Sequence, residues 1–172
     1  EDAGFDERSR GKLAHKAVEL LRPSGDNQSD ARRAAALAFG EFPELRALPQ
    51  EHTRKLHAQV EEMLGWLLAQ AELRPHLGRS GSELSILTAD DACLRPDMLA
   101  FTPSGPVVLE FKTGQASPEH AKQLRAYLAL AQQIAAGQGQ PNPAQGYLVY
   151  LDRRVVEPIA PPPLGAQKGG PA

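Results

Sequence analysis

The sequence predicts an α/β fold with a central mixed β-sheet flanked by helices, and three observations lead to this fold class. The first half of the chain carries apolar residues at the three- and four-residue spacing of helices. The second half changes to short runs rich in Val, Leu and Phe that are bounded by Pro, Gly and Ser. One further helical pattern interrupts these runs. The resulting order of helices, strands, helix and strands argues for an α/β or α+β protein, and we take α/β as the expectation.

Helices are expected in the first half over residues 8–22, 30–39 and 50–74. The first carries one broad apolar stripe and ends at the Pro-Ser-Gly-Asp turn of residues 23–26. The second is rich in alanine and is closed by Gly40 and Pro43. The third repeats apolar residues every three or four positions until Pro75 stops it.

Strands are expected in the second half over residues 83–88, 95–102, 107–112, 147–151 and 155–159. The Pro-Ser-Gly-Pro segment 103–106 should form the turn between the second and third of them. A helix is expected over residues 118–136, because Ser117 is a good N-cap and Pro118 suits the first helical position.

Composition limits the possible classes of protein. The length of 172 residues and the hydrophobic content of 41% suit one globular domain, expected over residues 1–160 with a Pro/Gly-rich tail over 161–172. The net charge of −2 excludes a strongly basic surface, so contact with nucleic acid would depend on local patches or a bound metal. No run reaches the ~18 apolar residues of a membrane span. Cys93 is the one cysteine, which excludes internal disulfides and cysteine-rich metal sites and suggests a reduced thiol in a cytoplasmic protein.

Charged residues interrupt the apolar strand over residues 107–112. Because side chains alternate along a strand, Glu110 and Lys112 share one face. A hairpin turning near Ser104 would put Asp97 opposite residues 111–112, close to both of them.

Two carboxylates that converge at a strand end repel each other unless a cation lies between them. Carboxylate oxygens suit Mg²⁺ or Mn²⁺, and a neighbouring lysine could orient or deprotonate a water whose pKa the metal lowers. Such a site could hydrolyse phosphodiesters. The alternative is a surface Asp97 and a Glu110–Lys112 pair at a fraying sheet edge, and spacing alone leaves it open.

The pattern Pro96-Asp97 … Glu110-Phe111-Lys112, with an apolar run before the second acid, resembles the PD-(D/E)XK nuclease signature. Further motifs resemble those of the RecB-like branch and follow in its order: Gly11-x3-His15, Lys112-Thr113-Gly114 and Gln123-x3-Tyr127. The resemblance covers residues 11–127 and implies a restriction-endonuclease-like core with N-terminal helices. It also places Glu83 where these domains often carry a further acid on the first strand.

The resemblance implies a role for each matching residue. The metal ligands would be His15, Asp97, Glu110 and the backbone carbonyl of Phe111. Glu83 would bind a second metal ion or only brace the site. Lys112 would position the water and stabilise developing charge, while Gln123 and Tyr127 would support Lys112 or hold the phosphate. The ion would be Mg²⁺ or Mn²⁺. An iron–sulfur cluster is excluded because the four cysteines of cluster-bearing relatives are missing.

Taken without the family, three of these residues have ordinary readings. His15 lies just beyond the apolar stripe of the first helix, where a solvated histidine is common. Gln123 could be a helix-edge amide, and Tyr127 a core aromatic.

The function expected from the resemblance is a metal-dependent DNA nuclease domain of a helicase–nuclease, acting in repair or recombination. The helicase would lie in the same chain or in a partner subunit, since this chain has no P-loop motif. Its start at Glu1, without Met, fits a piece of a longer protein. Candidate phosphate contacts, which are more often solvated surface, are Arg8, Arg10, Arg32, Arg33, Lys122, Arg125, Arg153 and Arg154.

Two alternatives remain at this point. One is a catalytically inactive DNA-binding or scaffolding module of the same fold. The other is an unrelated α/β protein with a chance motif, in which Asp97, Glu110 and His15 would not converge.

Overall fold

The computed structural model describes residues 2–78, 86–87, 93–140 and 142–163. Contacts divide the chain into two compact units. The first, here called the helical unit, comprises Glu1–Ser80, Phe111–Gly114 and Tyr150–Val155. The second, here called the sheet unit, comprises Gly81–Glu110, Gln115–Val149 and Val156–Ala172.

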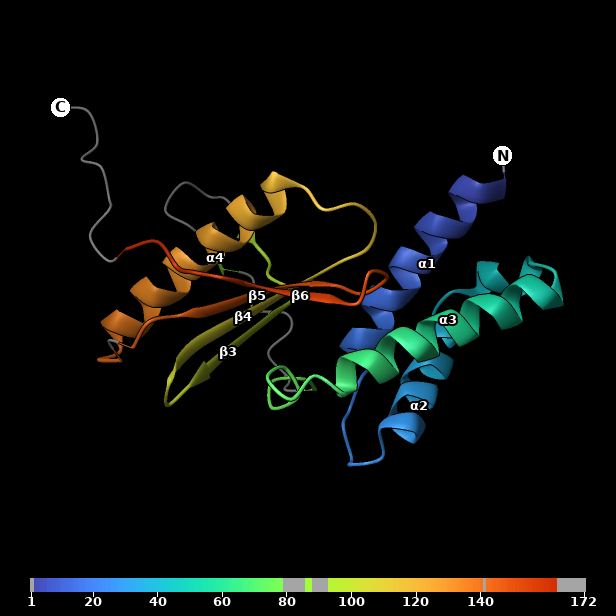
Figure 1. Ribbon diagram of the computed structural model, residues 1–172, viewed down its shortest axis with the longest axis horizontal. Coiled ribbons are helices and arrows are strands. Elements are labelled where there is room, and N and C mark those ends of the chain that lie inside the picture. Colours follow the sequence, from blue (N-terminus) through green and yellow to red (C-terminus); the bar gives the residue numbers. More distant parts are fainter. Residues whose placement is uncertain (1, 79–85, 88–92, 141, 164–172) are drawn as a thin grey trace. The chain divides into compact units, whose positions relative to one another are not determined.

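The helical unit is built from α1 (Asp2–Glu19), α2 (Asn27–Gly40), the short 3-10 helix η1 (Pro43–Ala47) and α3 (Gln50–Leu68). The three α-helices pack against one another (Figure 1). Leucine, valine and methionine side chains of α1 and α3 are buried between them. The buried face of α2 consists largely of alanine, at Ala31, Ala34, Ala35 and Ala38. Such small side chains let neighbouring helices approach closely.

Several helix boundaries differ from the predicted ones. The first helix begins at Asp2 rather than residue 8 and ends at Glu19 rather than 22. The third ends at Leu68 rather than 74, and turns follow it. Leu73 and Leu77 in these turns are buried. The turns therefore supply apolar side chains to the core, and Pro75 marks only the latest point at which a helix could have ended.

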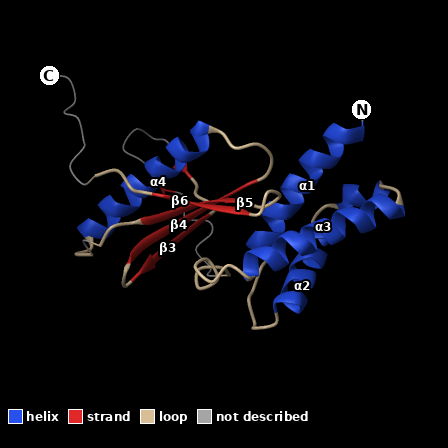
Figure 2. Ribbon diagram, in the orientation of Figure 1, coloured by secondary structure: helices blue, strands red, loops and turns tan. Residues whose placement is uncertain are grey.

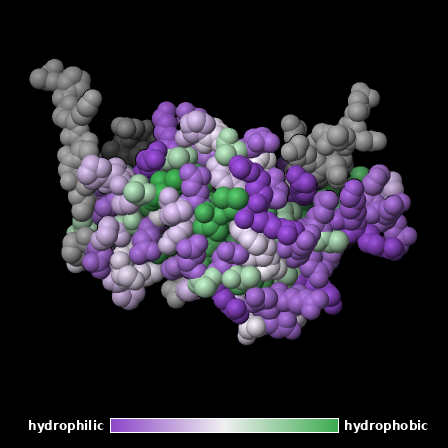
Figure 3. All heavy atoms as spheres, in the orientation of Figure 1, coloured by the Kyte–Doolittle hydropathy of each residue, from purple (hydrophilic) through white to green (hydrophobic). Residues whose placement is uncertain are grey.

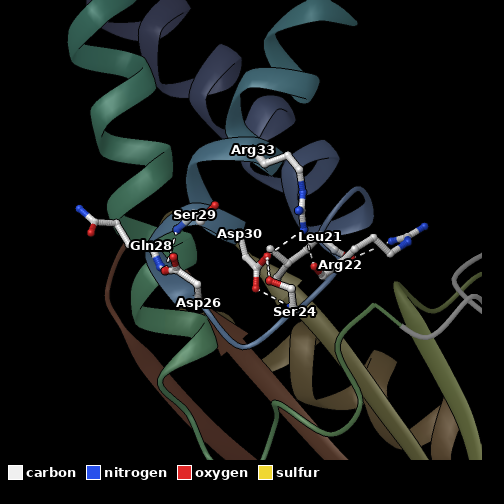
Figure 4. A network of polar contacts seen from close by, with 8 residues as sticks. All are labelled: Leu21, Arg22, Ser24, Asp26, Gln28, Ser29, Asp30 and Arg33. Atoms are coloured by element: carbon white, nitrogen blue, oxygen red, sulfur yellow. Dashed lines mark hydrogen bonds and ion pairs between the residues drawn. The ribbon is translucent and has the colours of Figure 1, made fainter.

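The connection between α1 and α2 holds a buried carboxylate (Figure 4). Asp30 is fully buried and accepts hydrogen bonds from the backbone N–H of Ser24 at 2.6 Å and its hydroxyl at 2.8 Å. Arg33 lies 2.8 Å from the same carboxylate. The N–H of Ser24 lowers the pKa of Asp30, against the opposing effect of burial. Asp26 caps the first turn, which is why α2 begins at Asn27 rather than at residue 30.

The four-stranded sheet has the order β3-β4-β5-β6. Its strands are β3 (Met98–Thr102), β4 (Gly105–Lys112), β5 (Gln145–Tyr150) and β6 (Val155–Ile159). β3 and β4 are antiparallel. The N–H of Leu151, just after β5, donates to the carbonyl of Lys112 at the end of β4, so these two strands end at the same edge and are parallel. The sheet is thus mixed, which confirms the predicted α/β class.

Helix α4 (Pro118–Gly137) connects β4 to β5 and lies along the sheet (Figure 2). Its first turn is as predicted, since the hydroxyl of Ser117 accepts the N–H of Glu119 and Pro118 follows it. Its buried face includes Leu128, which lies against Gly146 of β5.

A separate antiparallel pair joins β1 (Ile86–Leu87) and β2 (Cys93–Leu94). Of the strand predicted over residues 83–88, only the stretch 86–87 is described, and Glu83 lies outside the described residues. The strand predicted over residues 95–102 begins at Met98, because the chain bends beforehand, just after Pro96.

Hydrophilic side chains cover most of the face in Figure 3, with apolar residues between them in small patches. Among the residues whose burial is described, the exposed large hydrophobic side chains are Leu37 and Val155. None of the helices in the described ranges has the length and apolar character that crossing a membrane requires.

Candidate functional site

The β3–β4 hairpin determines where the first acid of the signature lies. Its register, extended by one residue, puts Asp97 opposite Glu110. The prediction that Asp97 falls opposite residues 111–112 is wrong, because the turn has only two residues and its centre lies before Ser104. Asp97 lies at the bend just before β3, one residue beyond the last pair, Met98 with Leu109. The extended register therefore brings the backbone of Asp97 beside Glu110.

Glu110 is buried, with 4% of its surface exposed, whereas Asp97 is partly exposed. The Oε2 atom of Glu110 accepts the backbone N–H of Asp97 at 3.3 Å. A charged carboxylate inside a sheet is unfavourable unless donors or a cation compensate it. The N–H of Asp97 is one such donor, and carboxylate oxygens are also ligands that suit Mg²⁺ or Mn²⁺.

The polar pair on α4 contacts the segment that precedes Asp97. Tyr127 is buried, and its hydroxyl accepts a hydrogen bond from Nε2 of Gln123 at 2.8 Å. The same hydroxyl donates to the backbone carbonyl of Arg95 at 3.4 Å. Tyr127 is thus both a core aromatic and a polar contact, and it ties α4 to the chain two residues before the first acid.

In the helical unit, α1 approaches the residues that follow β4. A Cβ built on the buried Gly11 would lie 2.8 Å from Oγ1 of Thr113. Glycine at this position therefore allows the helix to contact the Lys112–Gly114 segment. His15 is half-buried and lies one helical turn beyond Gly11, on the same face of α1.

The segment after Lys112 has a further partner that the sequence did not indicate. The backbone N–H of Gly114 donates to Oδ2 of Asp152 at 2.7 Å, and a terminal nitrogen of Arg10 lies 3.6 Å from the same oxygen. Asp152 falls between two of the predicted strands, and no role was predicted for it. Nothing in the local sequence marks Asp152, because its partners are far away along the chain.

Contacts within each unit therefore bring some of the predicted site and motif residues together. These pairs are Asp97 with Glu110, Gln123 with Tyr127, and Gly11 with Thr113. Phe111 is buried on β4 and Lys112 is half-buried at its end. Within the described ranges, which omit Glu83, no group of three or more His, Cys, Asp or Glu side chains is suited to hold a metal ion.

Comparison with families of known proteins matches residues 1–168 to the PD-(D/E)XK nuclease superfamily. No individual curated protein matches the chain. The family match extends well beyond residues 11–127, where the motifs lie. Members of this superfamily generally use divalent metal ions such as Mg²⁺. The family match covers nearly the whole chain, and the structure has the mixed sheet that this fold requires. The chain therefore belongs to the PD-(D/E)XK nuclease superfamily.

Proposed function

We propose that this chain is a divalent-metal-dependent nuclease domain that hydrolyses phosphodiester bonds in DNA. The observation that carries the proposal is the hydrogen bond from the backbone N–H of Asp97 to Oε2 of Glu110 at 3.3 Å, which supports a pairing of the two acids. Lys112 follows two residues later on the same face of β4. Two carboxylates that bind a metal ion, with an amine nearby, would be able to support metal-assisted hydrolysis of a phosphate ester.

Asp97 and Glu110 are the proposed metal ligands, together with the carbonyl of Phe111 and the imidazole of His15. Mg²⁺ or Mn²⁺ suits these mainly hard oxygen donors. When bound, the ion would supply Lewis-acid stabilisation of the charge that develops on the phosphate. Glu83 is proposed as a brace or as a ligand for a second ion.

The other site residues act through position and charge. The ammonium group of Lys112 would orient the attacking water and stabilise negative charge on the phosphate. Tyr127 holds the carbonyl of Arg95 and the amide of Gln123, so it would keep the chain before Asp97 in place. Gln123 is exposed beside it and is the side chain proposed to reach the phosphate.

A more specific proposal concerns the protein in which this domain acts. The motifs Gly11-x3-His15, Lys112-Thr113-Gly114 and Gln123-x3-Tyr127 support membership of the RecB-like branch. We propose that the domain cleaves DNA strands delivered by a helicase in the same chain or a partner, in cytoplasmic repair or recombination. The formal charge of −2 agrees with this, because delivery by a helicase requires little independent affinity for DNA.

The test is cleavage of end-labelled single- and double-stranded DNA with Mg²⁺ or Mn²⁺. Lys112→Ala and Asp97→Ala should each lower the rate by roughly 10²–10⁴-fold. Lys55→Ala is the matched control, because Lys55 is an exposed lysine of α3. Cleavage that persists in Lys112→Ala would overturn the proposed mechanism. A wild type that binds metal yet cleaves neither substrate would instead indicate an inactive module of the same fold.

A further inference from the structure

The turn between β5 and β6 contributes a carboxylate to which the function proposed above assigns no role. Asp152 lies in this turn, and its side chain is 16% exposed. Its Oδ2 atom accepts the backbone N–H of Gly114 at 2.7 Å. This distance is short for an N–H···O bond, as is usual when the acceptor is charged. The bond fixes the chain two residues beyond Lys112.

A second bond holds the chain on the other side of Thr113. The backbone N–H of Leu151 donates to the carbonyl of Lys112 at 3.0 Å. Gly114 itself has a φ of +87°, a conformation that favours glycine over residues with a Cβ. The segment after β4 therefore leaves the strand along one path, which two hydrogen bonds from the β5–β6 turn specify.

Arg10 interacts with Asp152 through its charge more than through a directed hydrogen bond. Its terminal nitrogen lies 3.6 Å from Oδ2 of Asp152, beyond hydrogen-bonding distance. Within the described part of the chain, the Nε of Arg10 and the Oδ1 of Asp152 are buried without a hydrogen-bond partner. The bond to Gly114 is thus the contact that sets geometry.

We propose that Asp152 is a positioning residue for Lys112, which acts by holding the backbone that directs the lysine side chain. This inference rests on the proposed function, because that function gives Lys112 its role. A lysine side chain has many rotamers, so a fixed backbone path limits where its ammonium group can lie. Asp152 itself is assigned no contact with substrate. Its loss should therefore lower kcat and leave KM nearly unchanged.

The experiment compares kcat and KM of the full chain and its variants on end-labelled DNA with Mn²⁺. Asp152→Ala removes the acceptor and should lower kcat by about 10- to 100-fold. Asp152→Leu, measured alongside, also removes the acceptor but keeps the branched shape of the side chain. Asp152→Asn keeps an amide oxygen for the N–H of Gly114 and should restore most of the rate. Arg10→Gln should have a smaller effect than Asp152→Ala.

Asp26→Ala is the matched control. Asp26 also accepts backbone N–H groups through its carboxylate, those of Gln28 and Ser29 at 3.1 Å, but it does so at the start of α2. Its loss should lower thermal stability without changing kcat. Hydrogen exchange at the amide of Gly114 gives a readout that does not depend on activity, and it should accelerate in Asp152→Ala and Asp152→Leu but not in Asp26→Ala.

The outcomes separate this inference from the function on which it rests. If Lys112→Ala is inactive while both acceptor-free variants keep the wild-type kcat, the inference is wrong and the nuclease proposal stands. An equal loss of kcat in Asp26→Ala, or no recovery in Asp152→Asn, would also overturn it. If the wild type shows no metal-dependent cleavage, the proposed function fails, and the positioning role fails with it.

Discussion

The contact between α1 and the segment after β4 can be tested at Gly11. In an open helical position, replacing Gly by Ala stabilises a protein by roughly 0.5–1 kcal/mol, because glycine loses more backbone freedom on folding. At Gly11 the new Cβ would lie 2.8 Å from Oγ1 of Thr113. Uncrowded contacts to carbon lie at roughly 3.5–4.0 Å, so the shortfall is about 0.7 Å.

That shortfall is enough to turn the usual stabilisation by a Gly→Ala substitution into a destabilisation. Thr113 is β-branched and has few χ1 positions into which it can withdraw. Crowding of this size in a packed region costs roughly 1–3 kcal/mol. Because the entropic gain offsets part of this cost, we expect Gly11→Ala to destabilise the protein by about 0.5–2 kcal/mol. Gly65, in α3, has no atom within 4 Å of its added Cβ, so Gly65→Ala should stabilise by about 0.5–1 kcal/mol.

The assay is urea unfolding of a double-mutant cycle that combines Gly11→Ala with Thr113→Ala. Removing Oγ1 should relieve the crowding, so the two changes should couple by about 1 kcal/mol or more. Crowding at Gly11 is ruled out if Gly11→Ala stabilises the protein as much as Gly65→Ala does. It is also ruled out if the effects of Gly11→Ala and Thr113→Ala simply add, within roughly 0.5 kcal/mol.

Three further predictions use unfolding measurements. A Cβ on Gly146 would lie 2.6 Å from Cδ1 of Leu128, so Gly146→Ala should destabilise the protein by roughly 1–3 kcal/mol. An unchanged urea midpoint would contradict this prediction. Tyr127→Phe removes a buried hydroxyl with two hydrogen bonds and should lower the free energy of unfolding by about 1–2 kcal/mol. An unchanged free energy of unfolding would mean that these bonds are not maintained in solution. The hydrogen bond from the N–H of Ser24 holds the pKa of Asp30 below its ordinary 3.8. Its contribution is therefore present above this pH and is lost as the pH falls through the lower, folded-state pKa. The free energy of unfolding should decline on acidification from roughly pH 5 to 3, less steeply in Asp30→Asn, and identical slopes would refute this assignment.

Local signals in the sequence located several elements almost to the residue. Ser117 and Pro118 fixed the start of α4, because capping depends only on neighbouring backbone groups. Elements bounded by distant contacts were predicted less well. The end of α3 was placed too late, since the turns that bury Leu73 and Leu77 depend on tertiary packing rather than on helix propensity.

The same distinction holds for the site. Strand alternation placed Glu110 and Lys112 on one face, but the opposing position of Asp97 required the length of the turn, and the predicted register was wrong. Asp152 could not be predicted, because it is 38 residues from its partner Gly114. Membership of the PD-(D/E)XK superfamily is confirmed by the match over residues 1–168, while the RecB-like branch and the individual roles of the site residues stay predictions.

The hairpin also explains why the spacing of the two acids is robust. The register that puts Asp97 opposite Glu110 also pairs Leu99 with Val108, and both of these are buried. A slip of one residue would turn the side chains of one strand to the other face and separate the buried pair. Hydrophobic burial of roughly 25 cal/mol per Å² therefore opposes any slip, whether or not a cation is bound. The apolar part of β4 thus specifies the register, and the relative position of the two acids at its end follows from the same packing.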